Sequence, residues 1–404
     1  MNQNNDPSPN VDAEGNPIKQ YWQPDRSSHS DNNTSIASTR GATAMLLPTG
    51  RVIAWGNDPS SQIPSDIAQL QDIVSLSATD DAFAALRKNR SVVAWGNENE
   101  GNGGEIPPEI AQLQDIISLK ATGSAFVALR ANGSIVAWGD EFYGGKIPDE
   151  IAQLQDITSL SSTISAFAAL RANRSVVAWG IKNWGGQVPP EIAKLQDIVS
   201  ISAIVSAFAA LRSNRSVVAW GFNNSGTQIP PEIAQLRDIV SLSATNFAFA
   251  ALRANHSVVA WGDQSSGGSI PPEIAQLQDI VSLCTTSSAF AALRANRSVV
   301  VWGGNDIKTP PEIAALQDIV SISATETAFA ALRMDGSVVA WGYGNYSDYD
   351  HGNQGNQVPL GIARLRDIVS LSASRNSFTV LRADGQRVGW GSANDNKLHN
   401  EYDN

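Results

Sequence analysis

The chain has 404 residues, of which 42 % are hydrophobic and 17 % charged, as in an ordinary globular protein in water. Its net charge of −11 argues against nucleic acid as a partner, because phosphate binding needs a basic surface. No stretch approaches the roughly 18 apolar residues of a membrane span, so we expect no membrane contact. The single cysteine, Cys284, excludes an intrachain disulfide, and we interpret it as a small buried side chain.

Residues 1–33 are rich in Asn, Asp, Ser and Pro, and we expect them to form a disordered polar tail. They lack a basic and then apolar signal peptide, which predicts a cytoplasmic protein, or one exported by a route without a cleavable signal. Within the tail, residues 18–22 read Ile-Lys-Gln-Tyr-Trp and could supply the first strand that the first repeat lacks. A second polar tail, residues 392–404, ends the chain.

Between the tails, residues 34–391 are built from a repeat of about 41 residues. Each copy carries Asp-Ile-Val-Ser-Leu-Ser, then a short variable stretch, Ala-Phe-Ala-Ala-Leu-Arg, a turn, and Ser-Val-Val-Ala-Trp-Gly. The Trp-Gly pair marks nine units, the first of them degenerate, and its tryptophans are expected to be structural. These are Trp55, Trp95, Trp138, Trp179, Trp220, Trp261, Trp302, Trp341 and Trp390.

Within a unit, three short β-branched runs predict three strands, and the second and third flank a tight turn as in a hairpin. Turns such as Asn132-Gly133 carry a type I′ signature. In five units the glycine is replaced, by Arg90, Arg174, Arg215, Arg297 or His256. A non-glycine residue at positive φ costs on the order of 1 kcal/mol, so either the turn type changes there or something offsets the strain. The Pro-Pro-Glu-Ile-Ala-Gln-Leu segment predicts one helical turn that must dock on its neighbours.

Strands of about six residues without long helices predict an all-β fold, and a period of 41 fits one blade of a β-propeller. One closed ring of nine blades is the simplest interpretation of nine Trp-Gly units. Seven blades with two extra repeats, or an open spiral, remain alternatives.

The run Val-Val-Ala-Trp-Gly, then Asn/Gly-rich residues, Gln-Ile-Pro, Asp-Ile-Val-Ser-Leu and Ala-Leu-Arg resembles the bacterial branch of the regulator of chromosome condensation propellers. That branch includes β-lactamase inhibitory protein II. The resemblance covers residues 34–391 and implies a propeller that grips a partner protein with one face of loops. The chain differs from the family in the loop after the first strand, where Thr79 and Ala82 stand in place of the usual Gly and His.

Strand order places the loop after each Trp-Gly and the loop after each first strand on one face. The hairpin turns and helical segments would lie on the other face. The first set varies between units and holds the unusual aromatic and aliphatic residues, which predict a protein-binding surface. These are Phe142, Tyr143, Ile181, Trp184, Phe222, Phe247, Tyr343, Tyr346 and Tyr349, with Ile204 and Val205 beside them. The alternative is that these residues pack locally around the channel mouth.

Each unit ends its second strand with Arg, as at Arg87, and begins its first with Asp, as at Asp72. We expect these to form cross-strand ion pairs, with an anion-binding ring of arginines as the alternative. The longest loop, 343–357, contains Asp348, Asp350 and His351, but their spacing matches no known metal site, and we predict no metal.

No nucleophile elbow, phosphate loop or Cys–His pair is present, so we predict no catalysis and no cofactor. The leading hypothesis is a monomeric binding module, inhibitor-like or an interaction scaffold, whose partner is another protein. A secreted bacterial effector or a structural component of an assembly is the alternative. Guanine-nucleotide exchange is disfavoured, because in the family it uses an inserted β-wedge and no loop here exceeds 15 residues.

Overall fold

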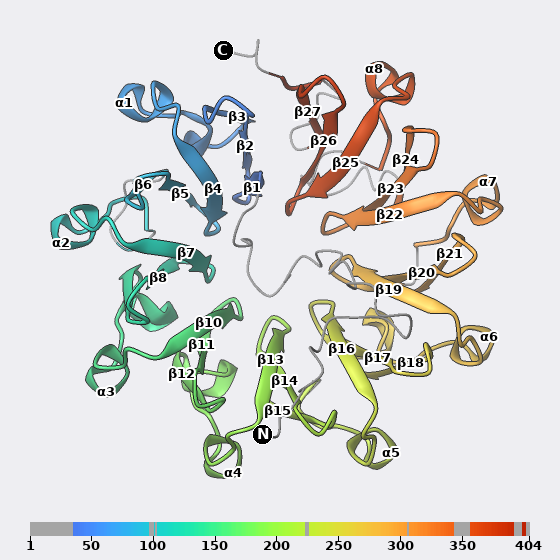
Figure 1. The fold of residues 1–404 in the computed structure, drawn as a ribbon, viewed down its shortest axis with the longest axis horizontal. Helices are drawn as coiled ribbons and strands as arrows, with labels where there is room; N and C mark the ends of the chain where they lie inside the picture. Colours follow the sequence, from blue (N-terminus) through green and yellow to red (C-terminus); the bar gives the residue numbers. More distant parts are fainter. Residues whose placement is uncertain are drawn as a thin grey trace, which may run out of the picture.

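The computed structural model describes residues 35–96, 101, 103–222, 226–304, 307–342, 356–391 and 398–400. Its strands form nine three-stranded antiparallel sheets, and each sheet uses one consecutive stretch of chain. The nine sheets are arranged as the blades of a ring (Figure 1). The predicted nine-bladed all-β propeller is therefore confirmed, and the seven-bladed alternative is wrong.

The blades are numbered 1 to 9 in chain order, and each contains three consecutive strands. Blades 1 to 3 contain β1 (Ile36–Ser38), β2 (Ala42–Leu46), β3 (Val52–Gly56), β4 (Ile73–Ala78), β5 (Ala82–Arg87), β6 (Val92–Gly96), β7 (Ile116–Ala121), β8 (Ala125–Arg130) and β9 (Ile135–Gly139). Blades 4 to 6 contain β10 (Ile157–Ser162), β11 (Ala166–Arg171), β12 (Val176–Gly180), β13 (Ile198–Ala203), β14 (Ala207–Arg212), β15 (Val217–Gly221), β16 (Ile239–Ala244), β17 (Ala248–Arg253) and β18 (Val258–Gly262). Blades 7 to 9 contain β19 (Ile280–Thr285), β20 (Ala289–Arg294), β21 (Val299–Gly303), β22 (Ile319–Ala324), β23 (Ala328–Arg333), β24 (Val338–Gly342), β25 (Ile368–Ala373), β26 (Ser377–Arg382) and β27 (Arg387–Gly391).

One short helix precedes each blade after the first, as the Pro-Glu-Ile-Ala segments predict. These are α1 (Ser65–Ala68), α2 (Pro108–Ala111), α3 (Asp149–Ala152), α4 (Pro190–Ala193), α5 (Pro231–Ala234), α6 (Pro272–Ala275), α7 (Pro311–Ala314) and α8 (Leu360–Ala363). Single turns η1 (Pro59–Ser61), η2 (Glu141–Gly145), η3 (Lys182–Trp184) and η4 (Gln264–Ser266) lie in four of the loops after Trp-Gly. Each α-helix buries its one isoleucine, as at Ile110 in α2, which docks the helix on its blade.

The core lies between neighbouring blades. The middle strand β5 is fully buried at Phe83 and at the alanines beside it, because small side chains let the sheets approach closely. Phe83 stacks on Trp95 of the third strand with ring centroids 5.1 Å apart, and the same pair recurs in every blade from 2 to 9. Ala84 of blade 2 shares one apolar cluster with Phe126 of blade 3, so each blade completes the core of the next.

The hairpin turns differ from the predicted type I′. In the turn with Gly133, the Gly133 N–H donates to the Arg130 carbonyl at 2.9 Å, and Gly133 alone has a positive φ, 78°. The Arg90 turn has the same form, with a φ of 64° at Arg90 alone. This is a type I turn followed by one left-handed residue, whereas type I′ needs two. The Asn89 side chain accepts hydrogen bonds from the backbone N–H and the hydroxyl of Ser91, which helps to hold the turn.

The ring closes where blade 9 meets blade 1. Thr43 of β2 is hydrogen-bonded to Ser377 of β26 at 3.0 Å, and the Trp55 indole N–H donates to the Gly391 carbonyl at 3.1 Å. An open spiral is therefore wrong. The expectation that the first unit lacks a first strand is also wrong, because β1 fills that place. Residues 18–22 lie outside the described residues.

The two groups of loops lie at opposite ends of the strands, as predicted, but these ends are the inner and outer edges of the ring. The first strands point toward the centre, and the helices lie on the outer rim (Figure 1). The expected division into an upper and a lower flat face is thus replaced by a centre and a rim. The loops after Trp-Gly connect the two, from the inner end of a third strand to a helix on the rim.

Candidate protein-binding surface

Each variable loop begins with the glycine of a Trp-Gly pair. In blade 4, Gly180 has a φ of 106°, and a Cβ there would lie 2.5 Å from the Ser165 carbonyl oxygen. Only glycine fits this close approach of two backbones at positive φ. The chain can therefore turn sharply at the end of β12 and start the loop that carries Ile181 and Trp184.

In blades 1 to 6, the tryptophan of the next blade holds the loop after Trp-Gly in place. The Trp220 indole N–H of blade 5 donates to the Gly185 carbonyl in the blade 4 loop at 3.1 Å. A Cβ at Gly185 would lie 2.7 Å from the Phe208 ring, so the loop backbone rests directly on that ring. The same hydrogen bond recurs in other blades, where the indole N–H donates to a backbone carbonyl 35 positions earlier in the chain. The donors are Trp95, Trp138, Trp179, Trp261 and Trp302.

Threonines after the first strands anchor the same loops from the inside of the ring. The Thr122 hydroxyl donates to the Tyr143 carbonyl at 3.0 Å, and the Thr163 hydroxyl donates to the Trp184 carbonyl at 3.2 Å. The two sets of loops that the sequence places together are thus in contact within a blade. A partner would meet backbone that is fixed before binding, which lowers the entropic cost of association.

The loops after the first strands join into a belt around the centre of the ring. The backbone N–H of one loop donates to the carbonyl of the next, at 2.8–3.1 Å, in eight successive steps. The belt residues are Arg40, Asp80, Gly123, Ile164, Val205, Asn246, Ser287, Glu326 and Arg375. The ninth step, from blade 9 to blade 1, uses the Asn376 side-chain amide, which donates to the Thr39 carbonyl at 3.0 Å.

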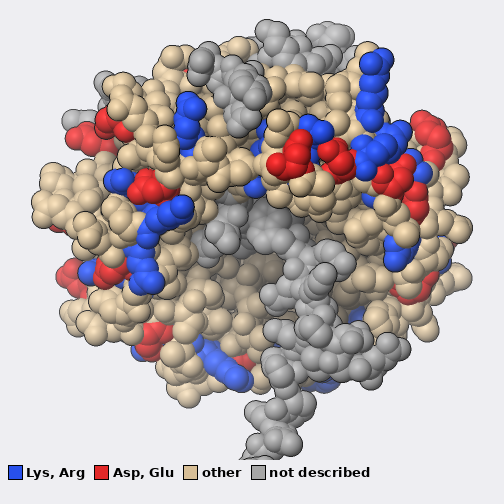
Figure 2. Space-filling model, turned by 45° about the horizontal axis from the view of Figure 1, so that its top comes forward, with Lys and Arg blue, Asp and Glu red and all other residues tan. Residues whose placement is uncertain are grey.

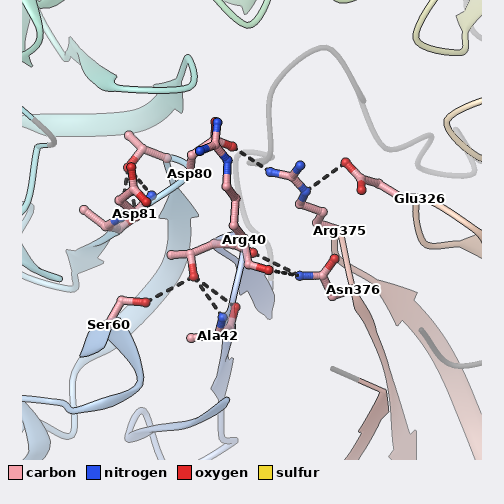
Figure 3. A network of polar contacts seen from close by, with 11 residues as sticks. Arg40, Ala42, Ser60, Asp80, Asp81, Glu326, Arg375 and Asn376 are labelled. Atoms are coloured by element: carbon pink, nitrogen blue, oxygen red, sulfur yellow. Dashed lines mark hydrogen bonds and ion pairs between the residues drawn. The ribbon is translucent and has the colours of Figure 1, made fainter. Parts of the chain in front are cut away.

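Four charged belt residues form a clasp over this ninth step (Figure 3). The Asp80 carboxylate accepts from Arg40 at 2.7 Å and from Arg375 at 2.6 Å, and Arg375 also pairs with Glu326 at 2.8 Å. The Asp80 side chain is only 5 % exposed, so the two guanidinium groups, in place of water, stabilise its negative charge. Beside it, burial raises the pKa of Asp81 above its ordinary value.

Three of the predicted aromatic residues are exposed. Phe142 is 79 % exposed, and Phe222 and Phe247 are 39 % and 44 % exposed. Trp184 is half-buried, with its ring centroid 6.1 Å from that of Phe222 in the next loop. These residues come from blades 3 to 6, which are consecutive, so they form one arc of the ring.

A surface groove of about 680 Å³ separates the loops of blades 3 and 4. Phe142 and Ile147 come from the first loop, Ile181 comes from the second, and Pro148, which directly precedes α3, also lines the groove. Lys146, Lys182 and three carboxylates rim the groove. A lining that is mostly apolar but includes charged side chains suits an apolar side chain of a protein partner.

Other predicted residues have different surroundings. Tyr143 is half-buried and packs on the apolar cluster of blades 3 and 4. Ile204 is 1 % exposed and belongs to the core, so its assignment to the binding face is wrong. Val205 lies in the belt and is half-buried. Tyr343, Tyr346, Tyr349, Asp348, Asp350 and His351 lie outside the described residues.

The predicted cross-strand ion pairs are present in blades 2 to 9. Their shortest N–O distances lie between 2.7 and 3.0 Å, as for Arg87 with Asp72. Acidic and basic side chains accordingly lie side by side around the ring (Figure 2). Because each side chain is a quarter to a third exposed, such a pair contributes little, roughly 0–1 kcal/mol. Each of these arginines already has a carboxylate partner.

Among the described residues, no group of three or more His, Cys, Asp or Glu side chains could hold a metal ion. Cys284 is buried, as predicted. In the same part of the chain, no helix has the length and apolar character needed to cross a membrane.

Neither the belt nor the clasp was predicted. The signal was present, because Arg40, Asp80, Glu326 and Arg375 carry charge at a loop position where the other five units have Gly, Ile, Val, Asn or Ser. All four charges fall in the first two and the last two units, which become neighbours only when the ring closes.

No family model and no curated protein matches the sequence. Among solved structures, the ectodomain of the Arabidopsis thaliana receptor kinase ACR4 is similar, with 18 % identity and a TM-score of 0.44 over 68 % of this chain and 98 % of that one. Prp20p from Saccharomyces cerevisiae, described with its binding to Gsp1p and histones, has 17 % identity and a TM-score of 0.36 over 81 % and 73 %. Yeast RCC1 (Prp20) bound to Kap60 has 18 % identity and a TM-score of 0.38 over 97 % and 84 %.

Proposed function

We propose that this protein is a non-enzymatic scaffold that binds a partner protein through the variable loops of blades 3 to 6. The observation that carries the proposal is the exposure of Phe142, Phe222 and Phe247 on loops whose backbone is hydrogen-bonded to the neighbouring blade. Elsewhere in the repeat, the aromatic residues of the strands are buried in pairs. Exposed aromatics on a rigid frame are typical of binding hot spots.

The groove between blades 3 and 4 would take one apolar anchor of the partner, and the Trp184–Phe222 pair would contact a second region. An inhibitor-like role, as the resemblance to β-lactamase inhibitory protein II implies, is one form of this function. Tyr343, Tyr346 and Tyr349 belong to the same proposal. Nothing in the geometry favours the effector or nucleotide-exchange alternatives.

The test begins with affinity capture on the full chain, with partners identified by mass spectrometry and the Kd measured for each. We expect Phe142→Ala and Trp184→Ala to weaken binding about thirty-fold each, because losing one aromatic anchor costs about 2 kcal/mol. The matched controls are Met334→Ala and Leu360→Ala, which remove apolar side chains that are 60 % and 76 % exposed elsewhere on the ring. They should leave the Kd unchanged.

A charge reversal of Arg90, Arg174, Arg215 and Arg297 to Glu should also leave binding intact. If binding is lost there and survives the aromatic substitutions, the site is the rim and the partner is acidic. The proposal is then wrong.

A further inference from the structure

Residues 398–400 pair with the third strand of blade 9. The Gly389 N–H of β27 donates to the His399 carbonyl at 2.8 Å, and the His399 N–H donates back to the Gly389 carbonyl at 3.0 Å. Two such mutual bonds define a hydrogen-bonded pair of an antiparallel ladder. It is the one isolated bridge in the part of the chain that the structure describes. We name residues 398–400 the strap.

The strap contacts two interfaces at once. Successive side chains of a strand point to opposite faces, so Leu398 and His399 leave the strap in opposite directions. Leu398 packs on the apolar cluster of blades 8 and 9, which includes Ile362 of α8. His399 is 6 % exposed and stacks on Trp55 of blade 1, with ring centroids 4.2 Å apart and an interplanar angle of 8°. The strap therefore connects blade 9 to blade 1.

Blade 1 lacks the aromatic residue on which its tryptophan would otherwise stack. Thr43 pairs with Trp55 in the same register in which Phe83 pairs with Trp95. In blades 2 to 9, a phenylalanine at this position stacks on the tryptophan of its own blade. In blade 1, His399 supplies the ring that Thr43 does not.

The helix before blade 9 also departs from the repeat where it meets the strap. Gly361 of α8 stands where the other seven α-helices have Asp or Glu. A Cβ at Gly361 would lie 2.5 Å from Leu398 Cδ1. A larger side chain at this position would therefore compete with Leu398 for the same space.

The strand β27 is altered at the residue that bonds to the strap. Gly389 stands where the other third strands have Ala or, in blade 7, Val. A Cβ there would lie 3.0 Å from the Trp55 ring and 3.3 Å from Met45 Sδ, so blade 1 approaches β27 closely beside the strap. Three exceptions to the repeat, at Thr43, Gly361 and Gly389, thus surround the strap.

We propose that the strap is a detachable lock that holds the ring shut at the junction of blades 9 and 1. The clasp acts on loops at the centre of the ring, whereas the strap joins the third strands of the two blades. Opening the junction requires either that His399 unstacks from Trp55 or that both backbone bonds to Gly389 break. Because the strap is short and has few bonds, it can detach as a local unit while the blades stay folded.

The first test compares the full chain with a chain that ends at Asn400 and one that ends at Lys397. Hydrogen exchange, followed by mass spectrometry, reports on β3 and β27. We expect both strands to exchange about ten-fold faster in the chain that ends at Lys397, because the strap is lost. Blades 4 to 6 should be unchanged. The chain that ends at Asn400 keeps the strap and should match the full chain.

An unchanged rate in the chain that ends at Lys397 overturns the proposal. Equal acceleration in both shortened chains also overturns it, because residues 401–404 are then responsible. The same holds for a uniform rise in all blades, which would mean that the strap stabilises the whole fold and not one junction.

The second test displaces the strap within the full chain, so it does not depend on the folding of a shortened chain. Gly361→Glu restores the glutamate of the repeat and fills the space of Leu398. We expect β3 and β27 again to exchange about ten-fold faster. The control is Leu360→Glu, which places the same charge on the preceding residue of α8, where the side chain is 76 % exposed. It should leave the exchange unchanged.

In the chain that ends at Lys397, Gly361→Glu should add no further acceleration, because Leu398 is already absent. The lock is disproved if Gly361→Glu has no effect in the full chain, or if it adds the same acceleration to both chains. Neither test changes a residue in the loops of blades 3 to 6, so the outcome is independent of the proposed partner surface.

Discussion

Five hairpin turns hold a non-glycine residue in the left-handed region. Arg90, Arg174, Arg215, Arg297 and His256 have φ values of 61–64°, where glycine stands in the turns with Gly133, Gly336 and Gly385. The side chains are exposed, so no packing compensates the strain of about 1 kcal/mol. The asparagine or serine hydrogen bonds within the turn offset part of it.

The turn strain predicts opposite effects for two glycine substitutions. Arg174→Gly should stabilise the fold by roughly 0.5 kcal/mol, because the relieved strain exceeds the added entropy of the unfolded chain. Ala172→Gly, two residues earlier in the same turn, should destabilise it by a similar amount, since φ is negative there. Urea unfolding midpoints measure both. Equal signs for the two variants would show that the left-handed conformation carries no strain.

At the scale of elements, the variable loops of blades 1 to 6 are each supported by a tryptophan of the following blade. Trp220 and Trp341 have the same stacked phenylalanine and the same burial, but they differ in one bond. The Trp220 indole donates to Gly185, whereas the buried Trp341 Nε1 has no hydrogen-bond partner among the residues that the structure describes.

This difference makes the two residues a matched pair for substitution. Trp220→Phe should lose about 1–3 kcal/mol more stability than Trp341→Phe, because it leaves the buried Gly185 carbonyl without a donor. Hydrogen exchange should also accelerate in the loop that carries Trp184, and partner binding should weaken with it. Identical losses in the two variants would mean that only the packing of the indole matters.

At the scale of the whole molecule, ring closure rests on side chains. Eight steps of the belt are backbone bonds, and the ninth is the Asn376 amide with the clasp around Asp80. The strands of blades 1 and 9 meet through hydroxyl pairs such as Ser38 with Ser374 at 2.6 Å.

Asp80→Asn should therefore destabilise the ring by about 3 kcal/mol, as expected when one partner of a buried charge network is removed. The control is Asp72→Asn, in a partly exposed pair at the outer ends of the strands, which should cost at most about 1 kcal/mol. Hydrogen exchange should rise around Thr43 and Ser377 and remain unchanged in blades 4 to 6. A uniform rise around the ring would contradict a local role for the clasp.

The sequence was sufficient to predict the blades, because the Trp-Gly pair and the strand pattern before it recur nine times at a nearly constant spacing. It was also sufficient for pairs within a blade, such as Arg87 with Asp72, since these depend only on the hairpin register. Contacts between distant repeats could not be predicted in the same way. The neighbours of Asp80 in space, Arg40 and Arg375, are separated by 335 positions in the sequence, and their meeting depends on how far each blade is rotated from the last.

The exposure of single loop residues was also beyond prediction. Phe142 and Tyr143 are adjacent, yet the first is exposed and the second packs on the core. The direction of each side chain follows from the η2 turn, whose geometry depends on the neighbouring blade. Ile204 was misassigned for the same reason, because it fills the core space beside Phe249.

Because every described blade is a consecutive stretch of chain, no strand between Ile36 and Gly391 pairs with a strand of another blade. A force applied between the two termini would therefore pull directly on the junction of blades 1 and 9. That junction should yield first, after which the blades should peel off singly from either side. Each would release about 41 residues, a lengthening of roughly 140 Å, so a stretched molecule should give a regular series of equal steps.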